Sequence, residues 1–483
     1  MTSRTRREFL EESMLATAAA VASTVSGDSA SASWLESPSP NERLGVVVMG
    51  VRGRGKTHLG VFSGRRDTEV LYVCDVDSDV GGRRIDELSR RQRGRRPRLV
   101  DDLRIALADP RVDIVSIAAP NHWHALAGIW SMQAGKDVYV ERPVSHNVAE
   151  GRNLVQASRK HRRICQAGFQ ARSNPGMIEA MRFAHSGGIG KLVAARAISW
   201  RRTTPRQRVT HPTTTSINRE LWMGPVIASA SRSPKIHFGW QQQWDYGNGL
   251  LGQDGLQPLD LGRWALGKDH WCGNVASYGC SWFAKPTPDA PDLQVAVYDL
   301  SGQSLVLESR VGPKSVVPRS QSAVIVSGTQ GYLVLSSFKS GVAFDLEGNK
   351  VCEFSGGGGN QWHFGNFIQA VRSRRLRDLN ADIEQGHRSS SLCHLGNIAY
   401  RLGHTVSRSQ AMTELCTPQS RHNPIAWDSA VQRLVERGLG TTGKEVQLGP
   451  VLEFDSQSER FIDHPFADRY LSRRYKSEFA TEV

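Results

Sequence analysis

A short apolar segment followed at once by three glycines constrains this chain more than any other feature. Leu44–Met49 has the pattern of a buried strand, and Gly50, Gly53 and Gly55 come directly after it. Glycines at this place allow a tight turn and let a pyrophosphate approach the backbone N–H groups that open the next helix. The pattern therefore predicts a Rossmann-type start to the fold, with a dinucleotide site at the glycine turn.

Two acidic residues follow the second predicted strand. Asp75 and Asp77 stand about twenty residues beyond the glycines, where a carboxylate accepts hydrogen bonds from the adenosine ribose and repels a 2′-phosphate. This position predicts NAD as the cofactor, with NADP less favoured. Arg52 occupies the place of the second glycine in the usual motif. Its side chain folds aside, contacts a phosphate, or blocks the approach, and the last case would leave a Rossmann fold that holds no dinucleotide.

Strands and helices alternate over residues 43–170, which predicts a doubly wound parallel sheet and an NAD(P)-binding domain of that extent. The predicted strands cover residues 44–49, 69–74, 112–118, 137–141 and 164–167. The predicted helices cover residues 56–62, 80–93, 103–107, 124–134 and 147–160.

Longer alternating segments predict a second α/β domain over residues 171–405, with a large, open and mostly antiparallel sheet. Its predicted strands cover residues 192–200, 294–299, 304–308, 323–328 and 332–336. One face of such a sheet is usually covered by another subunit, so a homodimer or homotetramer is expected. The glycines at 356–359 predict a flexible loop and no phosphate cradle, since neither a lysine nor a helix start is expected after them. Residues 406–483 are expected to form an extension that packs on the domains.

The first 32 residues have the layout of an export signal. Arg6 and Arg7 precede Phe9 and Leu10, a weakly apolar stretch follows, and residues 30–32 read Ala-Ser-Ala. This order is typical of a twin-arginine signal with its cleavage site, although a disordered basic tail is the alternative. A Pro- and Ser-rich linker follows over residues 33–42. We therefore expect export by the Tat pathway to the periplasm.

The composition limits the classes of partner. The formal charge is +14, and arginines at residues 90–96 form a basic cluster without interleaved aromatic residues, which favours a solvated surface over a nucleic-acid site. No apolar run reaches the roughly eighteen residues of a membrane-spanning helix. The 7 cysteines lack CxxC spacing, which predicts buried thiols and no metal site.

Several motifs resemble one known family. Residues 120–124 (PNHWH) and 135–143 (GKDVYVERP) resemble the cofactor domain of the Gfo/Idh/MocA family, named for glucose–fructose oxidoreductase and inositol dehydrogenase. Residues 244–249 (WDYGNG), 252–255 (GQDG) and 260–264 (DLGRW) look like its substrate domain. Residues 380–387 (NADIEQGH) and 392–398 (LCHLGNI) resemble a branch of exported members.

The resemblance implies a bound NAD(P) and reversible hydride transfer at a carbinol carbon of a sugar or cyclitol. It also implies a set of residues around the cofactor: Gly50, Arg52, Gly53, Gly55, Asp75, Pro120, Asn121, His124, Glu141 and Arg142. The implied substrate contacts are His237, Trp244, Tyr246 and Gln257, although core packing is an equal alternative for the tryptophans.

The sequence departs from the family at the two residues that are implied to take part in proton transfer. Arg142 replaces the lysine of the family's Glu-Lys-Pro motif, and Gln257 replaces its acid/base histidine. Arginine stays charged at working pH and glutamine does not titrate, so Asp254 becomes the candidate replacement base. We expect an NAD-dependent sugar or polyol oxidoreductase. The alternatives are an impaired or non-redox carbohydrate-binding member, and glycoside cleavage through transient oxidation.

Overall fold

The computed structural model describes residues 43–202, 216–227, 234–267, 272–281, 289–312, 322–407, 409–411 and 445–479. The predicted export signal and linker therefore lie outside the described residues, as does the first part of the predicted C-terminal extension from residue 412 to residue 444.

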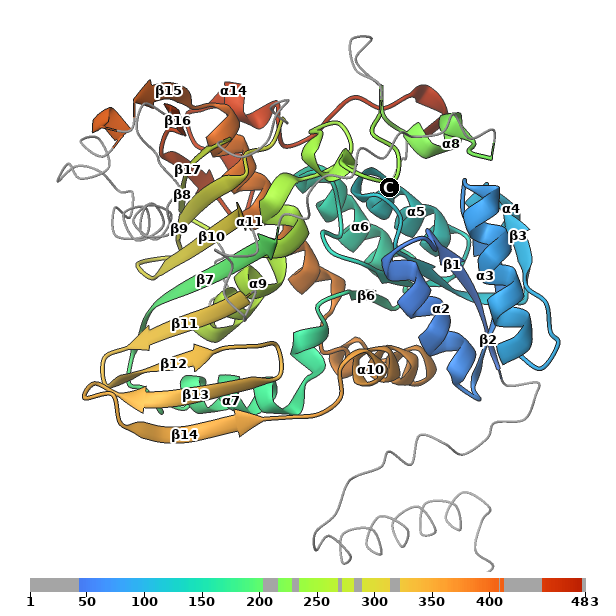
Figure 1. Cartoon of the computed structure of the whole chain (residues 1–483), viewed down its shortest axis with the longest axis horizontal. Helices are drawn as coiled ribbons and strands as arrows, with labels where there is room; N and C mark the ends of the chain where they lie inside the picture. The colour runs from blue at the N-terminus through green and yellow to red at the C-terminus, as the bar shows by residue number, and fades with distance from the viewer. Residues whose placement is uncertain are drawn as a thin grey trace, which may run out of the picture. The chain divides into compact units, whose positions relative to one another are not determined.

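The first sheet has six parallel strands in the order β3–β2–β1–β4–β5–β6 (Figure 1). They are β1 (Leu44–Met49), β2 (Thr68–Cys74), β3 (Arg98–Val100), β4 (Val112–Ile117), β5 (Asp137–Val140) and β6 (Cys165–Ala167). β1 lies at the centre, and its run of apolar residues is continuous because helices cover both faces of the sheet. Val46 and Val48 face one core, whereas Val47 and Met49 face the other.

Helices complete the doubly wound arrangement. They are α2 (Arg54–Gly64), α3 (Ser78–Arg91), α4 (Leu103–Leu107), α5 (Asn121–Gln133) and α6 (Val148–Lys160). Residues of α2 and α3 share one core with α10 (Asn360–Ser373), whose aromatic residues reach the sheet from far along the chain. α5 begins at Asn121, three residues earlier than predicted, because Pro120 caps it in an extended conformation.

The second sheet has 12 strands, and its main path is β14–β13–β12–β11–β7–β10–β9–β8–β16–β15. These strands are β7 (Leu192–Arg202), β8 (Asn274–Cys280), β9 (Leu293–Asp299), β10 (Ser304–Gly312), β11 (Ser322–Gly328), β12 (Gly331–Leu335), β13 (Ser340–Asp345), β14 (Lys350–Ser355), β15 (His404–Ser407) and β16 (Glu445–Leu448). The β7–β10 pair is parallel, and the other pairs on this path are antiparallel. The predicted fold class is thus confirmed.

Helices pack on one face of this sheet (Figure 1), namely α7 (Pro175–His185), α9 (Leu256–Leu266) and α11 (Ile383–Arg401). The prediction for residues 356–359 was wrong in one respect, because α10 starts immediately after them with Gly359 as its N-cap. The sequence gives no signal for this helix start, because the cap is a glycine and the first turn contains no acidic residue.

Residues 445–479 contact both parts of the fold. β16 and β17 (Leu452–Asp455) pair with β8 of the large sheet. Beyond them, Arg473 forms a 3.0 Å ion pair with Glu150 of α6, and the ring of Phe479 packs against Trp123 and Trp130 of α5. The described end of the chain therefore joins the large sheet to the cofactor domain.

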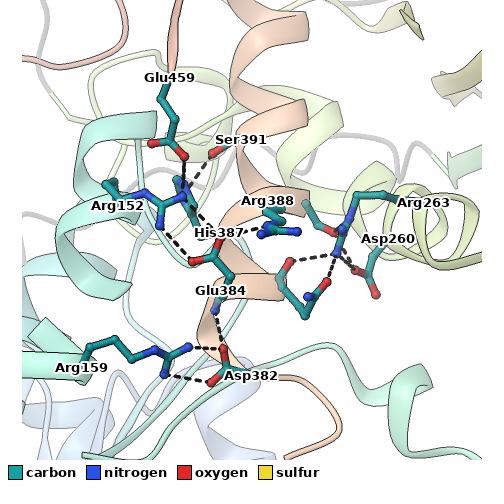
Figure 2. A network of polar contacts seen from close by, with 12 residues as sticks. Arg152, Arg159, Asp260, Arg263, Asp382, Glu384, His387, Arg388, Ser391 and Glu459 are labelled. Carbon is teal, nitrogen blue, oxygen red and sulfur yellow. Dashed lines mark hydrogen bonds and ion pairs between the residues drawn. The ribbon is translucent and has the colours of Figure 1, made fainter. Parts of the chain in front are cut away.

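A polar network ties the same segment to α6 and α11 (Figure 2). The Arg152 guanidinium lies 2.9 Å from Glu384 and 2.6 Å from Glu459, and the ring of buried His387 lies 2.7 Å from Glu459. Burial alone would raise the pKa of Glu459, but the contacts with His387 and Arg152 outweigh it and lower the pKa to about 2. Glu459 is therefore ionised at neutral pH and holds three elements together.

Two further observations concern the classes of partner. None of the described helices has the length and apolarity needed to cross a bilayer. The cysteines in the described part of the chain are free thiols, and all but the half-buried Cys352 are buried.

A buried ion pair fixes α9 beside the cofactor domain. Arg172 donates two hydrogen bonds of 2.8 Å to the carboxylate of Asp260, and Ser389 of α11 donates a third, of 2.6 Å. Arg263, one turn further along α9, binds Ser389 and Gln385. Because α9 carries Gln257 at its start, this pair sets the position of a candidate site residue.

Replacing Asp260 with alanine should lower the free energy of unfolding by about 3–5 kcal/mol, because Arg172 would stay buried without its counter-charge. Urea unfolding followed by tryptophan fluorescence measures the loss. The matched control is Glu353→Ala, which removes an exposed pair with Lys350 and should leave the transition in place. Equal midpoints for the two variants would contradict this assignment.

Candidate active site

A cavity of about 1690 Å³ runs from the glycine turn after β1 to the second domain. Its cofactor-domain wall contains Gly50, Asp75, Pro120 and Glu141. At the other end, which we call the substrate end, the described lining residues include Arg142, Gln170, Arg201, Asp254, Gln257 and Lys339. Segments far apart in the sequence thus meet around one space.

The glycine turn has the close packing that a phosphate-binding turn requires. Gly50 adopts φ +78°, and a Cβ there would stand 2.7 Å from the carbonyl oxygen of Ala118. A Cβ on Gly55 would stand 1.9 Å from the carbonyl oxygen of Gly50. Gly53 is the N-cap of α2, makes no side-chain cap, and has open space where its Cβ would be. The N–H groups at the start of α2 therefore remain available, which fits a pyrophosphate.

Arg52 lines the cavity but its guanidinium is bound to the second domain. Its Nη1 donates a 3.1 Å hydrogen bond to the carbonyl oxygen of His237, and its guanidinium carbon lies 4.0 Å from the centroid of the Phe238 ring. The imidazole of His237 lies 2.9 Å from the Asp77 carboxylate. Of the three alternatives for Arg52, the structure therefore shows the first: the side chain folds aside, toward residues 237–238.

The two acidic residues after β2 have different surroundings. Asp75 accepts hydrogen bonds from the backbone N–H groups of Val51 (2.8 Å) and Asp77 (3.0 Å), and it faces the cavity. Burial raises its pKa, partly opposed by these two bonds. Asp77 caps α3 through the N–H groups of Asp79 and Val80. Asp75 is therefore the carboxylate with acceptor capacity left for a ribose.

Glu141 joins α2, the helix that follows the glycine turn, to the substrate end. Its carboxylate accepts hydrogen bonds from Arg54 (2.8 Å), from Gln170 (3.0 Å) and from the ring of buried His58 (3.1 Å). Burial alone would raise the pKa of Glu141, but His58 and the Arg54 charge outweigh it and hold the pKa well below its usual range. Arg54 also donates to the side-chain oxygen of Asn360 at the start of α10.

Arg142 reaches the substrate end with part of its guanidinium engaged. Its Nη1 donates to the carbonyl oxygen of Gly168 and to Gln170, both at 3.1 Å, and lies 3.4 Å from Glu141. Its Nε is buried and has no hydrogen-bond partner among the described residues. Buried donors of this kind are normally satisfied by a ligand or by water.

Asp254 lies in a π-helical turn over Leu251–Gly255 that leads into α9. Its Oδ2 is buried and lacks a hydrogen-bond partner among the described residues, and Nη1 of Arg201 is 3.5 Å away. Burial raises the pKa of Asp254, while the charges of Arg201 and Arg142 oppose that rise. Gln257 follows one turn later and is buried in the same wall. Such π turns occur frequently at functional sites.

Two predicted substrate contacts lie elsewhere. Tyr246 is not among the described cavity-lining residues, because its ring packs 5.2 Å from that of His122 and 4.9 Å from that of Trp222. Trp244 is also outside the lining and lies 5.4 Å from the guanidinium of Arg401. Tyr246 belongs to an apolar core with Trp222, whereas Trp244 is half-buried. The predicted His124 does line the cavity, where its ring bridges the carbonyl oxygens of Pro143 and Ala119.

Among the residues that sequence reasoning missed are Arg54, Gln170 and Arg201, which line the cavity. Each contacts a charged residue that was predicted, and each comes from the end of an element that borders the cavity. A cation at the end of a predicted strand, as Arg201 is, was the one available signal. In the described part of the chain, His, Cys, Asp and Glu side chains form no group of three that could hold a metal.

Two family models match this chain. Residues 44–169 match the model described as "Oxidoreductase family, NAD-binding Rossmann fold", and residues 196–426 match "Oxidoreductase family, C-terminal alpha/beta domain". The chain belongs to the Gfo/Idh/MocA oxidoreductase family. The two matches cover both domains and leave the N-terminal 43 residues outside.

Curated relatives match about a third of the chain. Levoglucosan dehydrogenase of Pseudarthrobacter phenanthrenivorans is 24% identical over 168 residues, which is 35% of this chain and 36% of the relative. Inositol 2-dehydrogenase 1 of Saccharopolyspora erythraea is 30% identical over 32% of this chain and 45% of the relative. An alpha-N-acetylgalactosaminidase of Shewanella oneidensis is 26% identical over 33% of this chain and 38% of the relative. The chain thus spans less than half the length of these relatives.

Solved structures match over both domains. Aldose-aldose oxidoreductase from Caulobacter crescentus, complexed with glycerol, has a TM-score of 0.56 at 16% identity and covers 73% of this chain and 97% of its own. The WlbA dehydrogenase from Bordetella pertussis, in complex with NADH and UDP-GlcNAcA, has a TM-score of 0.54 at 17% identity over 73% of this chain and 95% of its own. At this identity the likeness shows the shared fold.

Replacing Gly55 with alanine should weaken both stability and NAD binding, because the added Cβ would collide with the Gly50 carbonyl and push α2 off the turn. We expect a loss of about 1–3 kcal/mol in unfolding free energy and a fall in NAD affinity of tenfold or more in a fluorescence titration. Gly60→Ala is the control on the same helix, where only the Arg91 side chain is near, at 3.5 Å. That control should be neutral or slightly stabilising, and indistinguishable behaviour of the two variants would refute the role of the turn.

Proposed function

We propose that this chain is an NAD-dependent oxidoreductase that transfers a hydride at a carbinol carbon of a sugar or polyol. The observation that carries the proposal is one cavity that joins the open start of α2 to two buried polar atoms without hydrogen-bond partners among the described residues, Nε of Arg142 and Oδ2 of Asp254. Relatives named as levoglucosan and inositol dehydrogenases support the choice of substrate class.

The residues of the cavity wall fit a dinucleotide. The N–H groups after Gly53 would hold the pyrophosphate, and Asp75 would accept hydrogen bonds from the adenosine ribose. Asp75 would also repel a 2′-phosphate, which favours NAD over NADP. Pro120 and Asn121, at the start of α5, and Glu141 with Arg142 would border the nicotinamide end. The bound cofactor supplies the hydride acceptor or donor.

The two buried atoms without hydrogen-bond partners at the substrate end are a donor, Nε of Arg142, and an acceptor, Oδ2 of Asp254. A hydroxyl group can bind both, because it accepts one hydrogen bond and donates another. A carbinol O–H would donate to Oδ2 of Asp254 and accept from Nε of Arg142. As the C–H hydride leaves, the hydroxyl proton moves to the Asp254 carboxylate and a C=O bond forms. Arg142 keeps its charge throughout and stabilises the developing negative charge on oxygen. In this scheme Asp254 is the base, and Gln257 only positions the substrate.

Purified protein tests the function directly. Absorbance and fluorescence should reveal bound or bindable NAD, and a sugar or polyol should reduce it in a stoichiometric burst. If NAD binds and no sugar or polyol changes its spectrum, the redox proposal fails.

The base assignment makes a pH prediction. The oxidation rate should fall as pH drops through the raised pKa of Asp254, since only the carboxylate form accepts the proton. Asp254→Asn should lower kcat by about 10²–10⁴-fold, keep NAD affinity, and remove that acid limb of the pH profile. An Asn variant with the wild-type rate and profile would exclude Asp254 as the base.

A second candidate is an impaired or non-redox member that binds a carbohydrate. It is favoured by Arg142 and Gln257, which replace the residues that the family resemblance assigns to proton transfer. The double variant Arg142→Lys, Gln257→His separates the two candidates. A large gain in turnover from a near-zero level supports the impaired member, whereas a loss supports the Asp254 scheme.

A third candidate is glycoside cleavage through transient oxidation. It is supported by the match to a relative named alpha-N-acetylgalactosaminidase.

The expectations of Tat export, a periplasmic location and assembly through the large sheet are also proposals. The paired Arg6 and Arg7 support the first two, and the length of the sheet supports the third. Cell fractionation of the full chain tests export and location. Light scattering, which measures the mass in solution, tests assembly.

A further inference from the structure

The adenosine end of the cavity contains two residues with opposite preferences for the cofactor. Asp75 faces the cavity, where its carboxylate accepts hydrogen bonds from a ribose and repels a 2′-phosphate. Arg52 lines the same space, and an arginine near the ribose accommodates a 2′-phosphate, which favours NADP. The direction of the Arg52 guanidinium therefore decides which of the two cofactors the site prefers.

Arg52 begins close to the carboxylate that would bind the ribose. The backbone nitrogen of Val51, the preceding residue, donates a 2.8 Å hydrogen bond to Oδ2 of Asp75. Burial lowers the pKa of Arg52, and the charges of Asp77 and Asp75 oppose that fall, so both acids act on the guanidinium. Arginine nevertheless stays charged at any working pH. A long charged side chain that starts here can reach a phosphate on the ribose.

A short turn of the second domain holds the guanidinium in another direction. Nη1 of Arg52 donates a 3.1 Å hydrogen bond to the carbonyl oxygen of His237, and the guanidinium carbon lies 4.0 Å from the centroid of the Phe238 ring. Both contacts come from residues 236–238, which we call the strap. A charge-assisted hydrogen bond and a cation–π contact together select one orientation of a flexible side chain.

The strap is itself anchored to the cofactor domain. Ile236 is buried in a small apolar core against which Val76 packs, and the imidazole of His237 lies 2.9 Å from the Asp77 carboxylate. The N–H of Phe238 donates a 2.9 Å hydrogen bond to the carbonyl oxygen of Ile236, and His237 between them has φ +70°, which is a strained γ-turn. Such strain persists only where surrounding contacts determine the conformation, as these two anchors do.

We propose that the strap makes this site selective for NAD, because it holds Arg52 away from the 2′ position of the adenosine ribose. A 2′-phosphate would then meet the Asp75 carboxylate without the counter-charge of Arg52, which costs free energy on binding. Released from the strap, the same guanidinium can bind that phosphate in a bidentate contact. His237 and Phe238 are thus specificity-determining residues that act through Arg52. The inference rests on the NAD binding of the proposed function and needs no turnover.

The experiment compares NADH with NADPH, which differ only in the 2′-phosphate. Nicotinamide fluorescence measures the dissociation constant of each cofactor on the purified full chain. The selectivity is the dissociation constant of NADPH divided by that of NADH. We expect a selectivity of at least tenfold for the wild-type protein.

Phe238→Ala should lower the selectivity at least tenfold, chiefly because NADPH binds more tightly to the released Arg52. The Phe238 ring is 53% exposed, so its removal should leave the thermal midpoint nearly unchanged. Phe466→Ala is the matched control. The Phe466 ring is 52% exposed, its centroid lies 5.5 Å from the guanidinium carbon of Arg469, and it is outside the cavity lining. This control should keep the wild-type selectivity.

A second pair of variants shows whether Arg52 carries the effect. Arg52→Gln should keep the wild-type selectivity, because the strap already holds the guanidinium away from the ribose. Phe238→Ala added to Arg52→Gln should then leave the selectivity unchanged, since no guanidinium remains to be released. A general loosening of the site would instead lower the selectivity equally in both backgrounds.

The outcomes separate this inference from the proposed function. Equal affinity of the wild-type protein for NADH and NADPH would overturn the inference and leave cofactor binding intact. So would an unchanged selectivity in Phe238→Ala, or an equal fall with and without Arg52. Weaker NADPH binding by Arg52→Gln would overturn it too, because the guanidinium would then already contact the phosphate. If neither cofactor binds the wild-type protein, the proposed function fails together with the inference.

Discussion

The carboxylate of Glu141 connects the two halves of the site. It lies at the end of β5 and accepts hydrogen bonds from Arg54 and His58 of α2. A third hydrogen bond comes from Gln170, whose side-chain oxygen accepts one from Arg142. Because Glu141 is buried and ionised, losing one of these donors would leave charge uncompensated in a low-dielectric interior. The same carboxylate therefore positions the start of α2 and the guanidinium at the substrate end.

Buried polar contacts, rather than apolar packing alone, determine how the second domain meets the first. Arg172 and Asp260 hold α9 beside the 170–173 turn, and Ser389 links this pair to α11. α11 in turn binds α6 and the C-terminal segment through Glu384, His387 and Glu459. Directional bonds of this kind allow few alternative arrangements, which suits a site whose reacting groups come from two domains.

Much of the fold could be predicted because it depends on local periodicity. The strands at 44–49 and 69–74 and the alternation after them were recognisable from apolar runs, glycines and acids alone. Strand β3 and the start of α10 were missed: β3 has three residues of which only Val100 is buried, and α10 begins after a glycine cap without acidic residues. Tyr246, which the family resemblance implies as a substrate contact, packs in a core with Trp222, because sequence cannot tell an aromatic residue in a cavity wall from one in a core.

The amino-acid sequence by itself determined the glycine turn, the acid that follows β2, the family motifs and the two departures at Arg142 and Gln257. These are matters of residue type and short spacing, and elementary stereochemistry connects them to a dinucleotide. Only the tertiary structure decided that one carboxylate oxygen of Asp254 is buried in the cavity wall, that Arg54 binds Glu141, and that Arg201 lines the same cavity as the cofactor-domain residues. Those relations join residues more than fifty positions apart, and their charges act on one another only after the chain has removed them from water.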